Sequence, residues 1–399
     1  MNRRNNMKRI AIPLLLSLSL LLSGCQNTDT GSNGGDSAST GAESVAVIDT
    51  AALFSDRDLD GSYDESAAVH IQLEGETAVC DSDAVSIDGS RITLLDEGTY
   101  LVSGALTDGQ IVVDAGDTDK VQIVLASASL TCADSAAIYS KSADKVFLTL
   151  AEGTENTLTN GGSYTAIDKN NIDSVVFSKT DLTLNGSGSL TIDAQAGHGV
   201  VSKDELTING GTFTVDSIDD CLHSGGALAV TGGTFTLSSG DDAIHSDDAV
   251  TIRAGEFSIP YCYEGVEGLS VTVEGAAFDV TAHDDGFNAA GGADSSGFGG
   301  RDEPFAASED SFITVNGGTI TVVSDGDCLD SNGDLTVNGG TLDLTCNGNG
   351  NTALDCSGSY TNNGGSVTTN DGSETNSGGR SGNRLEEERE PLPSGRPKA

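Results

Sequence analysis

Residues 206–249 contain one pattern twice in succession, and this repeat restricts the possible fold more than any other feature of the chain. The segment LTINGGTFTVDSIDDCLHSGGA is followed by LAVTGGTFTLSSGDDAIHSDDA, so that Phe213 aligns with Phe235, and His223 with His245, 22 residues apart. A short repeat of strand residues separated by Gly-Gly cannot bury its apolar face alone, so it must stack on further copies of itself. The repeat therefore predicts an all-β parallel β-helix, a solenoid with coils of about 22 residues.

Two columns of apolar residues extend this repeat along the chain. The first column contains Leu190, Phe213, Phe235, Phe257, Phe278, Ile320 and Leu342. The second column contains Leu222, Ile244, Val266, Phe287, Leu329 and Leu354. Successive steps in the first column are 23, 22, 22, 21, 42 and 22 residues, which fits one turn of three short strands. Strands between residues 45 and 120 are spaced less regularly and predict an irregular cap or first coils.

The step of 42 residues indicates an insertion near residues 289–310. The insertion adds about 20 residues to one normal coil, given the coil period. A long loop on a compact solenoid is more often a binding element than an accident, and we interpret it so. The alternative is a surface insertion that the fold tolerates.

Composition agrees with a solenoid and restricts the partners. The chain has 52 Gly, no Trp and 5% aromatic residues, which suits a narrow core of small and medium apolar side chains. Its formal net charge of −42 excludes a nucleic-acid partner, because phosphates require Lys and Arg. The acidity fits a highly solvated or cation-loaded extracellular protein.

The N-terminus resembles a bacterial lipoprotein signal peptide. Basic residues precede an apolar run from residue 10 to 22, which ends in Leu-Ser-Gly-Cys, similar to a lipobox. The resemblance implies cleavage before Cys25, its lipidation, and a lipid-anchored protein on the extracellular face of the cell membrane; the alternative is a signal peptide with a chance Cys. We expect four parts: a lipoprotein signal peptide (1–25), a flexible linker (26–45), the parallel β-helix (46–370) and a disordered tail (371–399).

Acidic residues recur once per coil, just before the second apolar column. Parallel coils lie about 4.8 Å apart. Two carboxylates at that distance repel by roughly 3 kcal/mol at an effective dielectric of 20, and by under about 1 kcal/mol in water. The column is therefore either a solvated acidic face or a site for cations, and Asp, Glu and Asn oxygens suit Ca²⁺. The predicted metal ligands are Asp219, Asp220, Asp241, Asp242, Glu264, Glu267, Asp284, Asp285, Asn288, Asp325 and Asp327.

A separate acidic loop begins like an EF-hand. Asp56, Asp58 and Asp60 alternate as EF-hand ligands do, but Ala67 stands where the bidentate Glu belongs. The loop is a weak candidate for a second Ca²⁺ site.

The histidines and cysteines do not indicate a specific site. We interpret His223 and His245 as exposed surface residues rather than ligands, and no CxxC motif or His/Cys cluster indicates zinc. Seven cysteines follow Cys25. Cys346 and Cys356 flank one turn and are the only pair that we consider for a disulfide.

Five stretches together resemble a known family: FSDRDLDGSYDE, GTYLVSGALTDGQIVVDA, SKTDLTLNGSGSLTI, YEGVEG and DDGFNAAGG. The chain is similar over about residues 46–370 to bacterial carbohydrate-binding-domain lipoproteins. The resemblance implies a calcium-binding, right-handed parallel β-helix with a pectate-lyase-like fold that binds polygalacturonate or cellulose. It also implies that the likeliest metal ligands are Glu264, Glu267, Asp284, Asp285 and Asn288.

We therefore expect a cell-surface, Ca²⁺-dependent carbohydrate-binding protein whose partners are an acidic or cellulosic polysaccharide and, through the lipid anchor, the membrane. Catalysis is not expected. One alternative is a pectate-lyase-like enzyme, which needs a base beside a Ca²⁺-bound uronate; Arg253 and Arg301 are the candidates. The other alternative is a structural adhesin with a protein partner.

Overall fold

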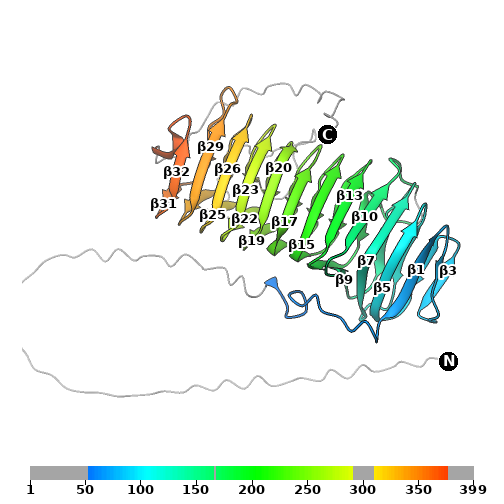
Figure 1. Ribbon diagram of the computed structural model, residues 1–399. Coiled ribbons are helices and arrows are strands. Elements are labelled where there is room, and N and C mark those ends of the chain that lie inside the picture. The colour runs from blue at the N-terminus through cyan, green and yellow to red at the C-terminus, as the bar shows by residue number, and fades with distance from the viewer. Residues whose placement is uncertain (1–52, 166–167, 291–309, 376–399) are drawn as a thin grey trace, which may run out of the picture. The chain divides into compact units, whose positions relative to one another are not determined.

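A computed structural model describes residues 53–165, 168–290 and 310–375. Within these ranges the chain winds into a parallel β-helix (Figure 1), as the repeat predicts. The signal peptide with Cys25, the linker and residues 376–399 of the tail lie outside the described residues, as do residues 291–309 of the insertion. No helix in the described ranges is long and apolar enough to cross a membrane.

The strands form two sheets that face each other across the core. One sheet contains β1 (Val69–Gly75), β2 (Ala78–Val79), β5 (Gly98–Leu106), β7 (Lys120–Cys132), β9 (Lys145–Leu150), β10 (Glu155–Asn160), β12 (Asp181–Gly186), β13 (Ser189–Ala194), β15 (Leu206–Ser217), β17 (Leu228–Ser238), β19 (Ala249–Ile252), β20 (Glu256–Cys262), β22 (Ser270–Val273), β23 (Ala277–Ala282), β25 (Phe312–Val315), β26 (Thr319–Ser324), β28 (Asp334–Val337), β29 (Thr341–Cys346), β31 (Tyr360–Asn362) and β32 (Ser366–Thr369). The other contains β3 (Val85–Asp88), β4 (Arg91–Leu94), β6 (Gln110–Asp114), β8 (Ile138–Ser142), β11 (Ser174–Ser178), β14 (His198–Ser202), β16 (Leu222–Ser224), β18 (Ile244–Ser246), β21 (Val266–Gly268), β24 (Phe287–Ala289), β27 (Leu329–Ser331) and β30 (Leu354–Cys356). A short 3₁₀ helix, η2 (Ser373–Thr375), follows the last strand.

The first apolar column is confirmed at every predicted step, from Leu190 paired with Phe213 to Ile320 paired with Leu342. The rings of Phe235 and Phe257 stack in parallel with centroids 4.5 Å apart. Such buried, offset-stacked rings supply a large share of the apolar area that holds neighbouring coils together. The 22-residue step holds only from β13 onward, because earlier coils are longer: Leu158 in β10 pairs with Ile192 in β13.

The second apolar column is confirmed as well, from Leu222 to Leu354. Phe287 in β24 pairs directly with Leu329 in β27, so the stack continues across the insertion. The insertion therefore adds chain without interrupting the core.

The N-terminal end of the solenoid is irregular, as predicted. β1 pairs antiparallel with β2, and β3 with β4, before parallel coils begin. Among the described residues, which begin at 53, the first strand begins at Val69. Residues 53–68 instead lie across several coils: Arg57 donates to Gln122, and Asn209 donates to the carbonyl of Leu59.

Cys346 and Cys356, the one pair considered for a disulfide, are not bonded to each other. All seven cysteines of the described ranges are free thiols. Cys346 donates to the carbonyl of Gly326, whereas Cys356 donates to that of Gly358. Cys346 thus contacts the preceding coil and Cys356 its own turn, and both pack as small apolar side chains.

Candidate metal centre

The acidic residues stack coil on coil because the turns that carry them are hydrogen-bonded to one another. The backbone N–H groups of Cys221, Gly265 and Gly286 donate to the carbonyls of Asp242, Asp285 and Asp327 in the next coil. These bonds place one acid above another, in the order Asp220, Asp242, Glu264, Asp285, Asp327. We call this set the acidic column.

The acidic column is buried. Relative exposure is 4% for Asp220 and Asp242, 8% for Glu264, 2% for Asp285 and 3% for Asp327. The alternative of a solvated acidic face is therefore wrong. A buried carboxylate requires a cation, a proton or several hydrogen bonds to offset its lost hydration.

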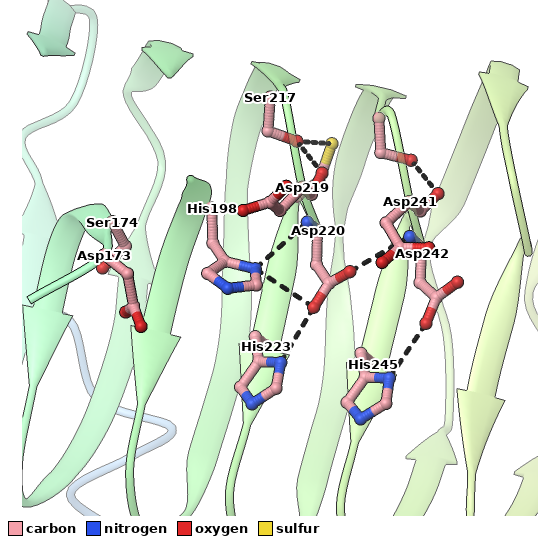
Figure 2. Close-up of polar contacts among 12 residues, drawn as sticks. Asp173, Ser174, His198, Ser217, Asp219, Asp220, His223, Asp241, Asp242 and His245 are labelled. Atoms are coloured by element: carbon pink, nitrogen blue, oxygen red, sulfur yellow. Dashed lines mark hydrogen bonds and ion pairs between the residues drawn. The ribbon is translucent and has the colours of Figure 1, made fainter. Parts of the chain in front are cut away.

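Imidazole side chains lie against the carboxylates in the N-terminal half of the acidic column (Figure 2). The Nδ1 atoms of His198 and His223 lie 3.1 and 2.8 Å from the same oxygen, Asp220 Oδ2. His245 Nδ1 lies 2.9 Å from Asp242 Oδ2 and 3.1 Å from Glu267 Oε2. His223 and His245 are thus not the exposed residues that the sequence predicted, since their side chains are only 16% and 4% exposed.

Charge pairing shifts the pKa values in this half. Burial lowers the pKa of His245, but the carboxylates of Asp242 and Glu267 outweigh burial and raise it to about 12. Burial raises the pKa of Asp220, but hydrogen bonds from His198 and His223 outweigh burial and hold that pKa well below its usual range. These groups form an alternating network of imidazoles and carboxylates.

The C-terminal half is rich in oxygen donors. Asn288 Nδ2 donates to Glu264 Oε2 at 3.0 Å, and the Asp327 N–H donates to Asp285 Oδ1 at 2.7 Å. Burial and the neighbouring carboxylate of Glu267 raise the pKa of Glu264 well above its usual value. Burial and the carboxylate of Asp330 do the same for the pKa of Asp285.

A second line of side chains runs beside this half. Glu267 pairs with Asn288, Asn288 with Asp330, and Asp330 with Asp355. Carboxylate oxygens of Asp327, Asp330 and Asp355 lie within 4.8 Å of one another. Asp330 and Asp355 directly follow Leu329 and Leu354 of the second apolar column, but they were not among the predicted ligands.

This donor set fits Ca²⁺. The ion takes six to eight oxygen ligands at 2.3–2.6 Å in irregular geometry. Glu264, Glu267, Asp285, Asn288 and the cluster of Asp327, Asp330 and Asp355 offer carboxylate and amide oxygens, most of them buried. A divalent cation here would replace the repulsion that raises the carboxyl pKa values with attraction.

The other predicted ligands lie at the edge of the acidic column. Asp219 and Asp241 are half-buried beside the imidazole half. Asp284 accepts a hydrogen bond of 2.7 Å from the Tyr263 hydroxyl. Asp325 is exposed, with its Oδ2 atom 3.5 Å from His283 Nδ1. These residues are more exposed than the members of the acidic column.

The EF-hand-like loop lies elsewhere and has a different role. Asp58 is buried, with Oδ1 2.7 Å from Lys145 Nζ, and the Thr183 hydroxyl donates to the same oxygen. Asp56 and Asp60 are exposed. The Asp58–Lys145 ion pair fixes the crossing segment 53–68 onto the solenoid, a role that no local sequence signal predicted.

Together, fold and site define a parallel β-helix protein with a buried column of carboxylates suited to divalent cations. The chain belongs to the family of carbohydrate-binding domain-containing proteins, whose pattern matches residues 88–350 and 241–383. It is similar to a carbohydrate-binding domain-containing protein of Acetivibrio thermocellus, with 36% identity over 135 residues, which cover 33% of this chain and 47% of the relative. The match therefore spans about half the length of that curated relative.

A solved structure is also similar. It is that of the polysaccharide lyase-like protein from C. thermocellum, as a gadolinium derivative, with 23% identity and a TM-score of 0.45. The alignment covers 76% of this chain and 94% of the solved chain.

Proposed function

We propose that the protein is a cell-surface carbohydrate-binding protein that uses Ca²⁺, bound in the C-terminal half of the acidic column, to hold a polysaccharide of the polygalacturonate or cellulose class. The observation that carries the proposal is the burial of Glu264 and Asp285 among further carboxylates. Membership in the carbohydrate-binding domain family supports the polysaccharide partner.

Calcium explains how an acidic protein holds an acidic polymer. Buried acids such as Asp285 would supply the inner ligands, and the half-buried Asp330 and Asp355 would hold the outer side of the ion. A cation that keeps positions open toward solvent attracts uronate carboxylates, so its own charge reverses the local repulsion. Chelation should then abolish polysaccharide binding.

Aromatic side chains beside the column provide a surface for sugar rings. Tyr261 is half-buried, and the exposed His283 ring meets it edge-on with centroids 5.0 Å apart. Tyr263, also half-buried, donates to Asp284. The chain has only seven Tyr and no Trp, and two of these Tyr, one at the end of β20 and one just after it, directly precede Glu264 of the column. Flat, amphipathic faces of this kind suit sugar rings, which are apolar on one side and polar at the rim.

Affinity electrophoresis tests the proposal. Migration of the purified protein through gels that contain polygalacturonate should be retarded with Ca²⁺ and normal with EDTA, and a cellulose pull-down extends the assay to neutral polymer. Equal retardation in the presence of Ca²⁺ and of EDTA would contradict the role of calcium in binding. Absorbance from unsaturated products should not rise; Arg253, a candidate base for a lyase, instead lies over the Phe54 ring at 5.8 Å.

The proposed location rests on Cys25. Its lipidation would hold the solenoid at the outer face of the membrane through the linker 26–45. A Cys25→Ser variant should leave the membrane fraction for the soluble fraction, and its continued sedimentation with membranes would contradict the anchor.

A further inference from the structure

The imidazole half of the acidic column has chemistry that calcium does not use. Three of the five histidines of the chain, His198, His223 and His245, occupy neighbouring coils, with the His223 ring between the other two (Figure 2). Calcium prefers oxygen ligands, whereas imidazole nitrogen suits zinc, copper and nickel. The two halves of the column therefore differ in the ions that they can bind.

We propose that His198 Nδ1, His223 Nδ1 and Asp220 Oδ2 form a binding site for a divalent transition metal ion of the zinc class, separate from the calcium site. Both nitrogens converge on one carboxylate oxygen, at 3.1 and 2.8 Å. Zinc binds imidazole nitrogen at about 2.0–2.1 Å and carboxylate oxygen at about 2.0–2.2 Å, so ligand atoms about 3 Å apart can share one ion. The inference does not depend on the proposed calcium function.

His198 Nδ1 has two polar neighbours that require opposite protonation states of this nitrogen, the carboxylate and the backbone N–H of Asp220. The backbone N–H of Asp220 points at His198 Nδ1 from 3.1 Å, which is the geometry of a donor facing a lone pair. An unprotonated nitrogen and a carboxylate oxygen 3.1 Å apart repel each other. A protonated Nδ1 can donate to Asp220 Oδ2, but its proton then faces the backbone N–H of Asp220, so neither protonation state satisfies both contacts. A metal ion that binds Nδ1 and Oδ2 removes the repulsion between them.

The carboxylate of Asp220 is held in place from behind. Its other oxygen, Oδ1, accepts the backbone N–H of Asp242 at 3.1 Å, so that Oδ2 faces the imidazoles. The His245 ring stacks on His223 with an interplanar angle of 5° and centroids 4.7 Å apart. Second contacts of this kind orient metal ligands and raise affinity.

The site is reachable from solvent. The His198 and His223 side chains are 19% and 16% exposed, whereas Asp220 is 6% exposed. Three protein ligands with an accessible side leave a fourth position for water or for an oxygen of a bound molecule. The site would therefore bind the metal ion without rearrangement of the coils.

Calorimetric titration of the untagged protein with Zn²⁺, in excess Ca²⁺, tests the inference. Wild-type protein should bind one equivalent, and Co²⁺ in its place should give d–d absorbance bands typical of nitrogen and oxygen ligands. His198→Gln and His223→Gln should each weaken binding at least 10-fold. His283→Gln, which alters an exposed histidine outside the site, should bind as wild type does.

Two results would overturn the site. One is wild-type protein that binds no Zn²⁺, in which case protons alone hold the network. The other is equal Zn²⁺ affinity in wild type, His198→Gln and His223→Gln. Melting curves without metal verify that the variants fold, and the use of two variants guards against one that does not. Asp285→Asn, which affects only the proposed calcium site, should retain Zn²⁺ binding.

Discussion

The backbone N–H of Asp327 donates to Asp285 Oδ1 across 2.7 Å, although 42 residues separate the two in sequence. This hydrogen bond joins the coils on either side of the insertion. Asp285 is 2% exposed, and burial together with the Asp330 carboxylate raises its pKa well above the usual value. The Asp285 side chain thus links two coils, and its buried carboxylate would be stabilised by a bound cation.

The variant Asp285→Asn should lose most of the stabilisation by Ca²⁺. An amide oxygen can still accept the Asp327 N–H, so the coil contact survives while one negative charge disappears. Ca²⁺ at 100 times its dissociation constant should stabilise the wild-type protein by about 2.7 kcal/mol. For a domain of this size that corresponds to a rise in melting temperature of roughly 4 °C, measured by calorimetry with Ca²⁺ and with EDTA.

The matched control is Asp343→Asn, which makes the same change at an exposed position of β29. Its calcium-dependent shift should equal that of the wild type. An undiminished shift in Asp285→Asn would show that the ion binds elsewhere.

The variant Tyr261→Ala should weaken retention by polysaccharide without altering the calcium-induced melting shift. Tyr261 contacts the ring of His283 beside the column but is not a proposed metal ligand. Stacking contacts of aromatic rings contribute about 0.5–1.5 kcal/mol, which predicts a 2- to 10-fold loss of affinity. Affinity electrophoresis measures it.

Tyr63→Ala is the control, because it removes another half-buried tyrosine far from the column in sequence. Its retention should match that of the wild type. If both variants are retained equally, the aromatic surface has no part in binding.

The sequence predicted which residues align but not how their side chains are surrounded. A 22-residue period fixes the register, so the column from Asp220 to Asp327 could be read directly. Burial was not predictable, because the period does not say whether a turn residue points to solvent or along the stack. For the same reason His245 was assigned to the surface, although its side chain is 4% exposed between two carboxylates.

Contacts between distant segments were also hidden from the sequence. The Asp58–Lys145 pair joins residues with no common pattern. The alternating acids around Asp58 favoured a metal-binding loop. The ion pair with Lys145 accounts for the buried charge of Asp58 without a metal ion. The 22-residue period predicts contacts only between copies of the repeat. Residues 53–68 are not such a copy, so their contacts with the solenoid could not be predicted.

The variant Phe235→Ala should destabilise the solenoid strongly. The ring is 1% exposed and stacks between Phe213 and Phe257, at centroid distances of 5.2 and 4.5 Å. Truncation of a buried Phe to Ala typically costs about 3–5 kcal/mol, through lost burial and the cavity that remains. Denaturant unfolding measures the change, with the exposed neighbour Thr236→Ala as control; equal stabilities would contradict a continuous aromatic core.

The variant Asp58→Asn should destabilise the protein at neutral pH and lose that effect in acid. Removal of one partner of a buried ion pair costs about 3–5 kcal/mol, because Lys145, only 12% exposed, keeps an uncompensated charge. Burial raises the Asp58 pKa, but Lys145, Ser55 and Thr183 outweigh burial and hold it below the ordinary carboxyl value of 3.8. A carboxyl with a lowered folded-state pKa stabilises the protein fully above its unfolded pKa and loses this contribution as pH falls through the folded pKa.

The difference in unfolding free energy between wild type and Asp58→Asn should therefore be constant above about pH 5 and shrink below the unfolded pKa near 3.8. Urea titrations across this range measure it. The control Asp56→Asn changes an exposed neighbour and should have wild-type stability at every pH. A difference that persists unchanged in strong acid would mean that packing of Asp58, not its charge, holds the crossing segment to the solenoid.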